Sequence, residues 1–124
     1  MTLEELYNRI DGNFEQACKV LRIEKLIDKH IRKFPNGGVT EALIEAGKTM
    51  DPVALFESAH AMKGVCSNLG LTALSEPASA IAEEFRPSNT RKLTDEQVKD
   101  ILGKIEMQYR KTVDGIHSYE QSTL

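Results

Sequence analysis

The sequence predicts an all-α protein: an antiparallel four-helix bundle with an additional N-terminal helical segment. Three observations support this prediction. No stretch alternates apolar and polar side chains with a period of two, as a half-buried strand would. Apolar residues recur at helical spacing in several segments instead, and short polar connections separate those segments. Helices that each carry one apolar stripe bury those stripes by packing against each other.

The composition fits one soluble domain over residues 1–124, with its core expected at about 14–119. Hydrophobic residues make up 40% of the chain, and the net charge is −3 without any basic cluster, so nucleic acid and anionic membranes are poor partners. No apolar run approaches the roughly 18 residues of a membrane span. The N-terminus lacks the apolar stretch of a signal peptide. Cys18 and Cys66 fit reduced, buried side chains, so we expect a cytoplasmic protein.

In the first half of the chain, a short helix precedes a long one. Thr2 and Glu5 have the spacing of a capping box for a helix ending near Arg9, and a turn follows at 11–13. Helical spacing then covers 14–34, is interrupted by Pro35-Asn36-Gly37-Gly38, and resumes over 39–48. The pattern leaves open whether this is one kinked helix or two. The inward residues of the last segment are Val39, Ala42, Leu43 and Ala46.

Three further helices are predicted in the second half. Asp51-Pro52 starts one, since Asp is a favoured N-cap and Pro suits the first helical position, and Gly70 ends it. The next covers about 71–85, but Pro77 leads us to expect that it begins near Ser75 or bends there. Thr94 and Gln97 open a long helix over about 95–119, with the last five residues or so frayed. The inward residues are Leu74, Ala78, Ile81, Ala82 and Phe85, then Val98, Ile101, Leu102, Ile105, Tyr109, Val113 and Ile116.

His60 is a candidate functional residue because it points away from the apolar side of its helix. At about 100° per residue, the opposite side carries Leu55, Ser58, Ala59, Met62, Val65, Cys66 and Leu69. The face of His60 carries Lys63, Gly64, Ser67, Phe56 and Val53.

These neighbours suit phosphoryl chemistry. A neutral imidazole can attack phosphorus, and Lys63 is placed to offset the charge that develops on the phosphoryl oxygens. Gly64 destabilises the helix by about 1 kcal/mol relative to Ala. A need to leave room for another protein beside His60 would explain a glycine at this position. Phe56 and Val53 provide an apolar docking surface, or else pack beneath the N-terminal segment or the 37–38 glycine pair. Ser67 either hydrogen-bonds near the site or is simply solvated.

Other chemistries find little support in the sequence. There is no phosphate-binding glycine loop and no nucleophile-elbow motif, so nothing indicates a nucleotide or acyl-transfer site or an intrinsic kinase. His30, His60 and His117 lie on different predicted helices without metal-ligand spacing, so we expect no metal. His30 near a helix C-terminus is explained by the helix dipole, and His117 is equally uninformative.

The segment 60–70, HAMKGVCSNLG, resembles the histidine-containing phosphotransfer (HPt) domain family. The family pattern is a His, then Lys and Gly three and four residues later, small or apolar residues, and a final apolar-Gly pair. The predicted helices over 14–119 resemble the family's architecture as well. The sequence departs from the family pattern in one respect. Some members carry a Gln on the following helix, whereas residues 81–86 of this chain, IAEEFR, contain none. Arg86 could assist instead, and we expect Glu83 and Glu84 to point away from His60.

The resemblance implies a phosphorelay intermediate without kinase activity. His60 would be the phosphoacceptor, Lys63 would steady the phosphoryl group, and Gly64 would leave room for the partner. The partners would be response-regulator receiver domains, which would supply the Mg²⁺, or a hybrid histidine kinase; this chain would need no cofactor. Met1 and the self-contained bundle favour a free-standing monomer. The alternative is a helical adaptor that binds a receiver or a partner helix without carrying phosphate.

Overall fold

The structure is a computed structural model that describes residues 1–123, and over this range it contains helices and no strands. The all-α prediction is therefore confirmed. None of the helices in this range is both long and apolar enough to cross a membrane. The helices are α1 (Leu3–Arg9), α2 (Phe14–Leu21), α3 (Glu24–Lys33), α4 (Val39–Thr49), α5 (Pro52–Asn68), α6 (Thr72–Glu84) and α7 (Asp95–Ser122), with a 3₁₀ turn at Phe34–Asn36.

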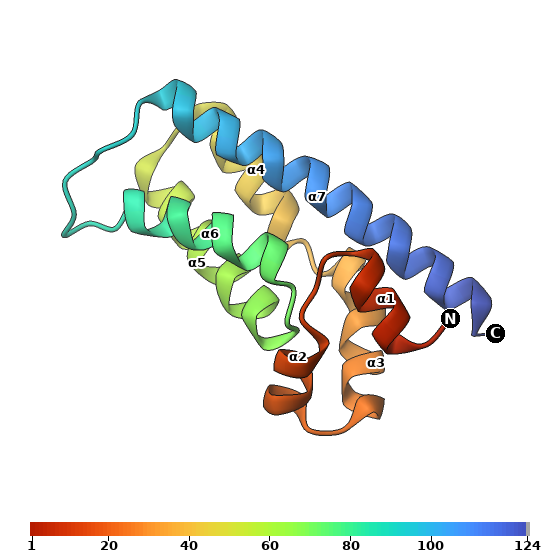
Figure 1. The fold of residues 1–124 in the computed structure, drawn as a ribbon. Coiled ribbons are helices and arrows are strands. Elements are labelled where there is room, and N and C mark those ends of the chain that lie inside the picture. The colour runs from red at the N-terminus through yellow and green to blue at the C-terminus, as the bar shows by residue number, and fades with distance from the viewer. Residues whose placement is uncertain (124) are drawn as a thin grey trace.

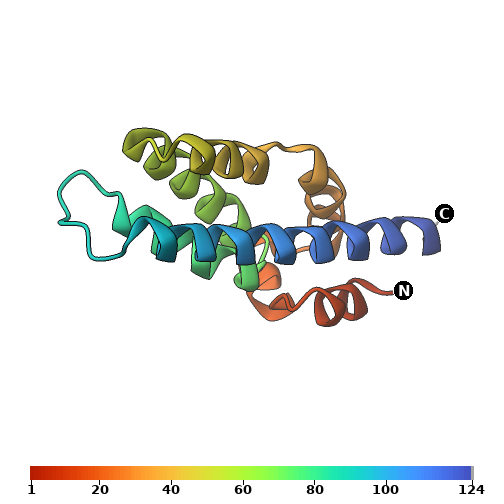
Figure 2. The same cartoon turned by 90° about the horizontal axis from the view of Figure 1, so that it is seen from above.

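Helices α4 to α7 form the antiparallel four-helix bundle. Each packs against the next, and α7 also packs against α4 and so closes the ring (Figure 1). Because α7 is the longest helix, its C-terminal half extends beyond the bundle. Helices α1 and α3 pack against this extension, and Figure 2 shows them on opposite sides of it. The additional N-terminal segment thus covers the part of α7 that the bundle leaves open.

The buried core begins before the expected limit of 14, because α1 contributes to it. Leu6 and Tyr7 are fully buried, and Ile10 is 1% exposed. The Tyr7 hydroxyl donates a hydrogen bond to the carbonyl of Leu69, at 2.6 Å, so α1 is fixed to the C-terminal end of α5. The N-terminal segment is therefore an integral part of the structure around that helix.

The single helix predicted over 14–34 is wrong. Helix α2 ends at Leu21, Arg22 adopts a positive φ of 70°, and Ile23 is extended before α3 begins. This corner lets α2 lie against α5 while α3 packs along α7. One straight helix could not make both contacts. The question left open at 35–38 is also answered: α3 and α4 are separate helices, joined by the 3₁₀ turn and by Gly38 at φ 79°.

Two inward positions were wrongly predicted. On α4, Ala42 is exposed and Thr40 is buried instead, with its hydroxyl 3.8 Å from the sulfur of Met62. The buried stripe of this helix consists of Thr40, Leu43, Ala46 and Gly47. On α5, Val65 is 38% exposed, since it borders a surface hollow next to the α3–α4 connection. The inward residues predicted for the α6 segment are all buried. Of the two free cysteines, Cys66 is buried, but Cys18 is only half-buried.

The boundaries of the last two helices also differ from the prediction. Helix α6 begins at Thr72 rather than near Ser75 and includes Pro77. Pro77 has no backbone N–H, so the helix lacks one hydrogen bond to a carbonyl of its first turn. Burial of Leu74 and Ser75 holds this first turn in place. Helix α7 continues to Ser122, although we expected the last five residues or so of the chain to be frayed. Position 124, the last of these, lies outside the described residues.

Candidate functional site

Local signals fix both ends of α5, and long-range contacts hold its C-terminal end. The Asp51 side chain accepts a hydrogen bond from the backbone N–H of Ala54 at 3.1 Å, and Pro52 occupies the first helical position. At the other end, Gly70 has a φ of 67°, and a Cβ atom there would collide with the backbone of Asn13. Gln16 donates a side-chain hydrogen bond to the Ser67 carbonyl at 2.9 Å. Helix α5 is thus held rigidly against α2.

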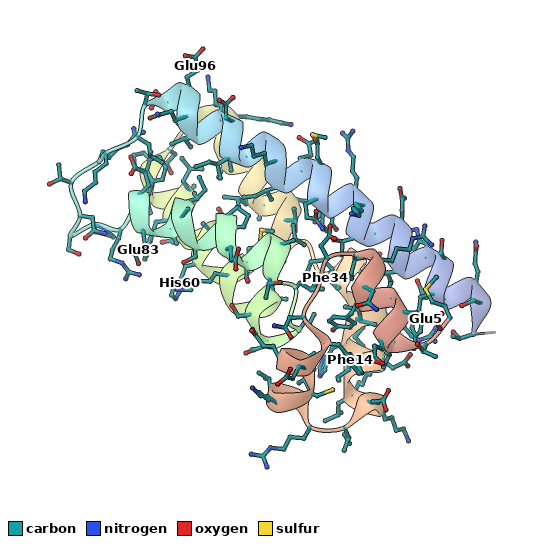
Figure 3. The ribbon with its side chains drawn as sticks, in the orientation of Figure 1. Glu5, Phe14, Phe34, His60, Glu83 and Glu96 are labelled. Carbon is teal, nitrogen blue, oxygen red and sulfur yellow. The ribbon has the colours of Figure 1, made fainter. Side chains whose placement is uncertain are left out.

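His60 is exposed on the outer face of α5, as predicted (Figure 3). Its imidazole stacks on the Phe56 ring one turn earlier, with 5.6 Å between the ring centroids and 21° between the planes. The opposite side of the helix is buried in the core through Leu55, Ala59, Met62, Cys66 and Leu69. The register deduced from the sequence is therefore confirmed, and Phe56 limits the directions in which the imidazole can point.

Lys63 follows His60 on this face and is half-buried. Within residues 1–123, its amine makes no ion pair with a carboxylate. An amine without a carboxylate in ion-pair distance can interact with an anion that arrives beside it. Lys63 is therefore available to a phosphoryl group on His60.

Gly64 leaves an open surface beside His60. A Cβ atom added there would meet no atom within 4 Å, so packing inside the protein does not require a glycine. Val53, on the same face, is 61% exposed. Ser67 is half-buried, and its carbonyl accepts hydrogen bonds from Gln16 and from the backbone of Gly70. The six residues predicted for the site therefore lie on one face of one helix.

The end of α6 contributes a network that the sequence did not reveal. The Arg86 guanidinium lies 5.5 Å from the centroid of the Phe56 ring and donates to a Glu83 carboxylate oxygen at 2.7 Å. Phe56 therefore packs between His60 and Arg86, rather than beneath the N-terminal segment or the 37–38 glycine pair. The three-residue spacing of Glu83 and Arg86 at the end of α6 could have indicated their ion pair, but nothing in the sequence links Arg86 to Phe56.

We expected Glu83 to point away from His60, but its carboxylate lies within the electrostatic influence of Lys63 on the face of His60. The carboxylate accepts a hydrogen bond from Arg86, the residue that contacts Phe56. Hydrogen bonds from Arg86 lower the pKa of Glu83, and the charge of Lys63 lowers it further. Figure 3 shows Glu83 at the end of α6 nearest to His60. Asn89 also donates to this carboxylate, at 3.2 Å. Two donors thus compensate the negative charge that would otherwise repel a phosphoryl group.

Glu84 does point away from the candidate site, as expected. Its buried carboxylate accepts hydrogen bonds from the backbone N–H groups of Lys92 and Leu93, the latter at 2.8 Å, and from Arg91 at 3.2 Å. Partial burial opposes ionisation, but these donors outweigh it and lower the pKa of Glu84. Glu84 therefore anchors the loop that leads from α6 to α7.

Among residues 1–123, no group of three or more His, Cys, Asp or Glu side chains is arranged to hold a metal ion.

Comparison with known proteins identifies the family. The model of the Hpt domain family matches residues 3–114 of the 124-residue chain. No curated protein and no solved structure shows a significant match. The matched range includes α4, α5 and α6, α7 as far as residue 114, and the network around Phe56. The chain therefore belongs to the Hpt domain family, which has a phosphotransfer role in two-component signalling.

Proposed function

We propose that this protein is a phosphorelay intermediate in which His60 accepts a phosphoryl group from an aspartyl-phosphate receiver domain and passes it to another receiver. The proposal rests chiefly on one arrangement. An exposed imidazole, oriented by Phe56, is followed one turn later by the unpaired amine of Lys63 and the open surface at Gly64. Family membership supports the reaction class, and this arrangement supports the choice of residues.

The proposed transfer is a displacement at phosphorus. An unprotonated ring nitrogen of His60 forms the N–P bond while the P–O bond to the aspartyl carboxyl group breaks, and aspartate leaves as a carboxylate. The other ring nitrogen keeps its hydrogen. Lys63 offsets negative charge on the phosphoryl oxygens. Transfer to the second receiver is the reverse of this step, so the chain itself needs no kinase activity.

Most of the catalytic groups would belong to the receiver, which we expect to hold the Mg²⁺. This chain would supply the nucleophile, one cation and a docking surface, because phosphoryl transfer depends mainly on positioning and charge stabilisation. Gly64 would admit the active site of the receiver, and Val53, Phe56 and Ser67 would form the surface on which it docks. The 61% exposure of Val53 supports this assignment, since an apolar side chain gains from being covered.

The test combines transfer with binding. Receiver domains phosphorylated in vitro are mixed with the wild type, with His60→Gln and with His117→Gln, whose histidine lies exposed on α7 and serves as the matched control. The proposal predicts transfer to the wild type and to His117→Gln, none to His60→Gln, and calorimetric binding of a receiver by all three. Binding by all three without transfer to any would establish the adaptor alternative.

A further inference from the structure

A surface pocket between α3 and α5, which we call the α3–α5 pocket, has no part in the proposed phosphotransfer. It has a volume of about 350 Å³, within the range of small-molecule sites. Five apolar side chains form most of its wall: Leu21, Phe34, Val39, Val65 and Leu69. Phe34 and Leu69 are each 4% exposed, so the deep part of the pocket continues into the core.

Two basic residues line the α3–α5 pocket. His30 and Lys33 come from the last turn of α3, and both are exposed, so they lie at the mouth. Neither pairs with a carboxylate within residues 1–123. No Asp or Glu lines the pocket, whereas four other hollows on the described surface each include at least one glutamate.

An apolar interior with a lysine amine and an imidazole at its mouth is complementary to an amphipathic anion. We propose that the α3–α5 pocket binds a small carboxylate with an apolar body, such as a medium-chain fatty acid. The apolar body would displace water from the wall formed by Phe34, Val39 and Leu69. The carboxylate would remain at the mouth beside Lys33 and His30, where it gains charge-assisted hydrogen bonds and stays partly hydrated.

Gly37 offers a way to fill the pocket without straining the backbone. It lines the pocket in a right-handed conformation, at φ −76° and ψ −22°, which any L-residue adopts readily. A Cβ atom there would meet only the Phe34 carbonyl oxygen, at the ordinary contact distance of 3.4 Å. Gly37→Leu should therefore keep the fold while it occupies the ligand space. Gly103→Leu is the matched control, because a Cβ atom at Gly103 meets no atom within 4 Å and α7 lies away from the pocket.

The experiment is an NMR titration of the full chain with octanoate, compared with octan-1-ol and octylammonium. We expect saturable amide shifts at Val39, Val65 and Leu69, and binding of octanoate at least about tenfold tighter than of either comparison compound. Lys33→Gln, an exposed substitution that does not endanger the fold, should remove this preference. Gly37→Leu should abolish binding, and Gly103→Leu should retain it. Absent or non-saturating shifts, equal binding of octan-1-ol, or unchanged binding by Gly37→Leu would overturn the proposal.

Discussion

Replacing Gly64 should raise stability and lower phosphotransfer at the same time. The position lies inside α5, and an added Cβ atom would meet nothing within 4 Å. Gly64→Ala therefore gains helix propensity of about 0.8–1 kcal/mol without a packing cost. For a domain of this size, that corresponds to an increase in the melting temperature of roughly 3–5 °C. Gly64→Gln should gain about half as much, since Gln is a somewhat weaker helix former than Ala.

Transfer should respond in the opposite direction, because the space over Gly64 is where we place the receiver. We expect Gly64→Gln to slow single-turnover transfer from a phosphorylated receiver by at least about tenfold, equivalent to about 1.4 kcal/mol. Gly103→Ala and Gly103→Gln are the matched controls: this glycine lies inside α7, also with no atom within 4 Å of a Cβ. They should raise the melting temperature similarly and leave transfer unchanged.

Two results would refute this reasoning. Wild-type transfer rates in Gly64→Gln would mean that open space beside His60 is not used by the partner. A lower melting temperature in Gly64→Ala would mean that a contact of this glycine has been overlooked. Far-UV circular dichroism and a transfer assay on the same preparations separate the two effects.

Three further predictions concern Lys63, Tyr7 and Glu84. Lys63→Gln should slow transfer by about tenfold or more, because the phosphoryl oxygens lose a nearby cation. It should change the free energy of unfolding by less than about 0.5 kcal/mol, because the Lys63 amine has no carboxylate partner in residues 1–123. An equal loss of transfer rate in Lys104→Gln would argue against a specific role of Lys63. Tyr7→Phe should lower the free energy of unfolding in urea by about 1–3 kcal/mol, because the Leu69 carbonyl loses a buried donor; unchanged stability would contradict this. The pKa of Glu84 lies below its ordinary value of 4.5, so its stabilisation is present above that value and is lost as the pH falls through the lower folded-state pKa. Glu84→Gln should flatten this acid-side dependence in unfolding experiments; an unchanged profile would show that another group is responsible.

Local signals predicted the parts of the fold that depend on neighbouring residues. Thr2 and Thr94 cap their helices through the expected capping boxes, and Asp51 caps α5. The face of His60 was predictable as well, because most apolar residues of α5, among them Leu55, Met62 and Cys66, are buried on the opposite side. Spacing along a helix is sufficient to decide both kinds of feature.

Other features depend on contacts between distant segments and could not be predicted. The corner at Arg22 contains no glycine or proline, and apolar spacing continues through it, so only the packing of α2 on α5 explains why the helix stops there. The hydrogen bond from Tyr7 to Leu69 joins residues 62 positions apart. The contact between Arg86 and Phe56 likewise depends on how α5 and α6 cross. Thus the sequence indicates the nucleophile, while the structure reveals the groups that surround it.

The most direct test of the central claim is the chemical identity and position of the transferred phosphate. The wild type is labelled by a phosphorylated receiver, treated with acid or base, and mapped by mass spectrometry across His30, His60 and His117. We predict a single phosphohistidine at His60 that is acid-labile and base-stable and is absent from His60→Gln. Label on another residue, or label retained in His60→Gln, would contradict the account.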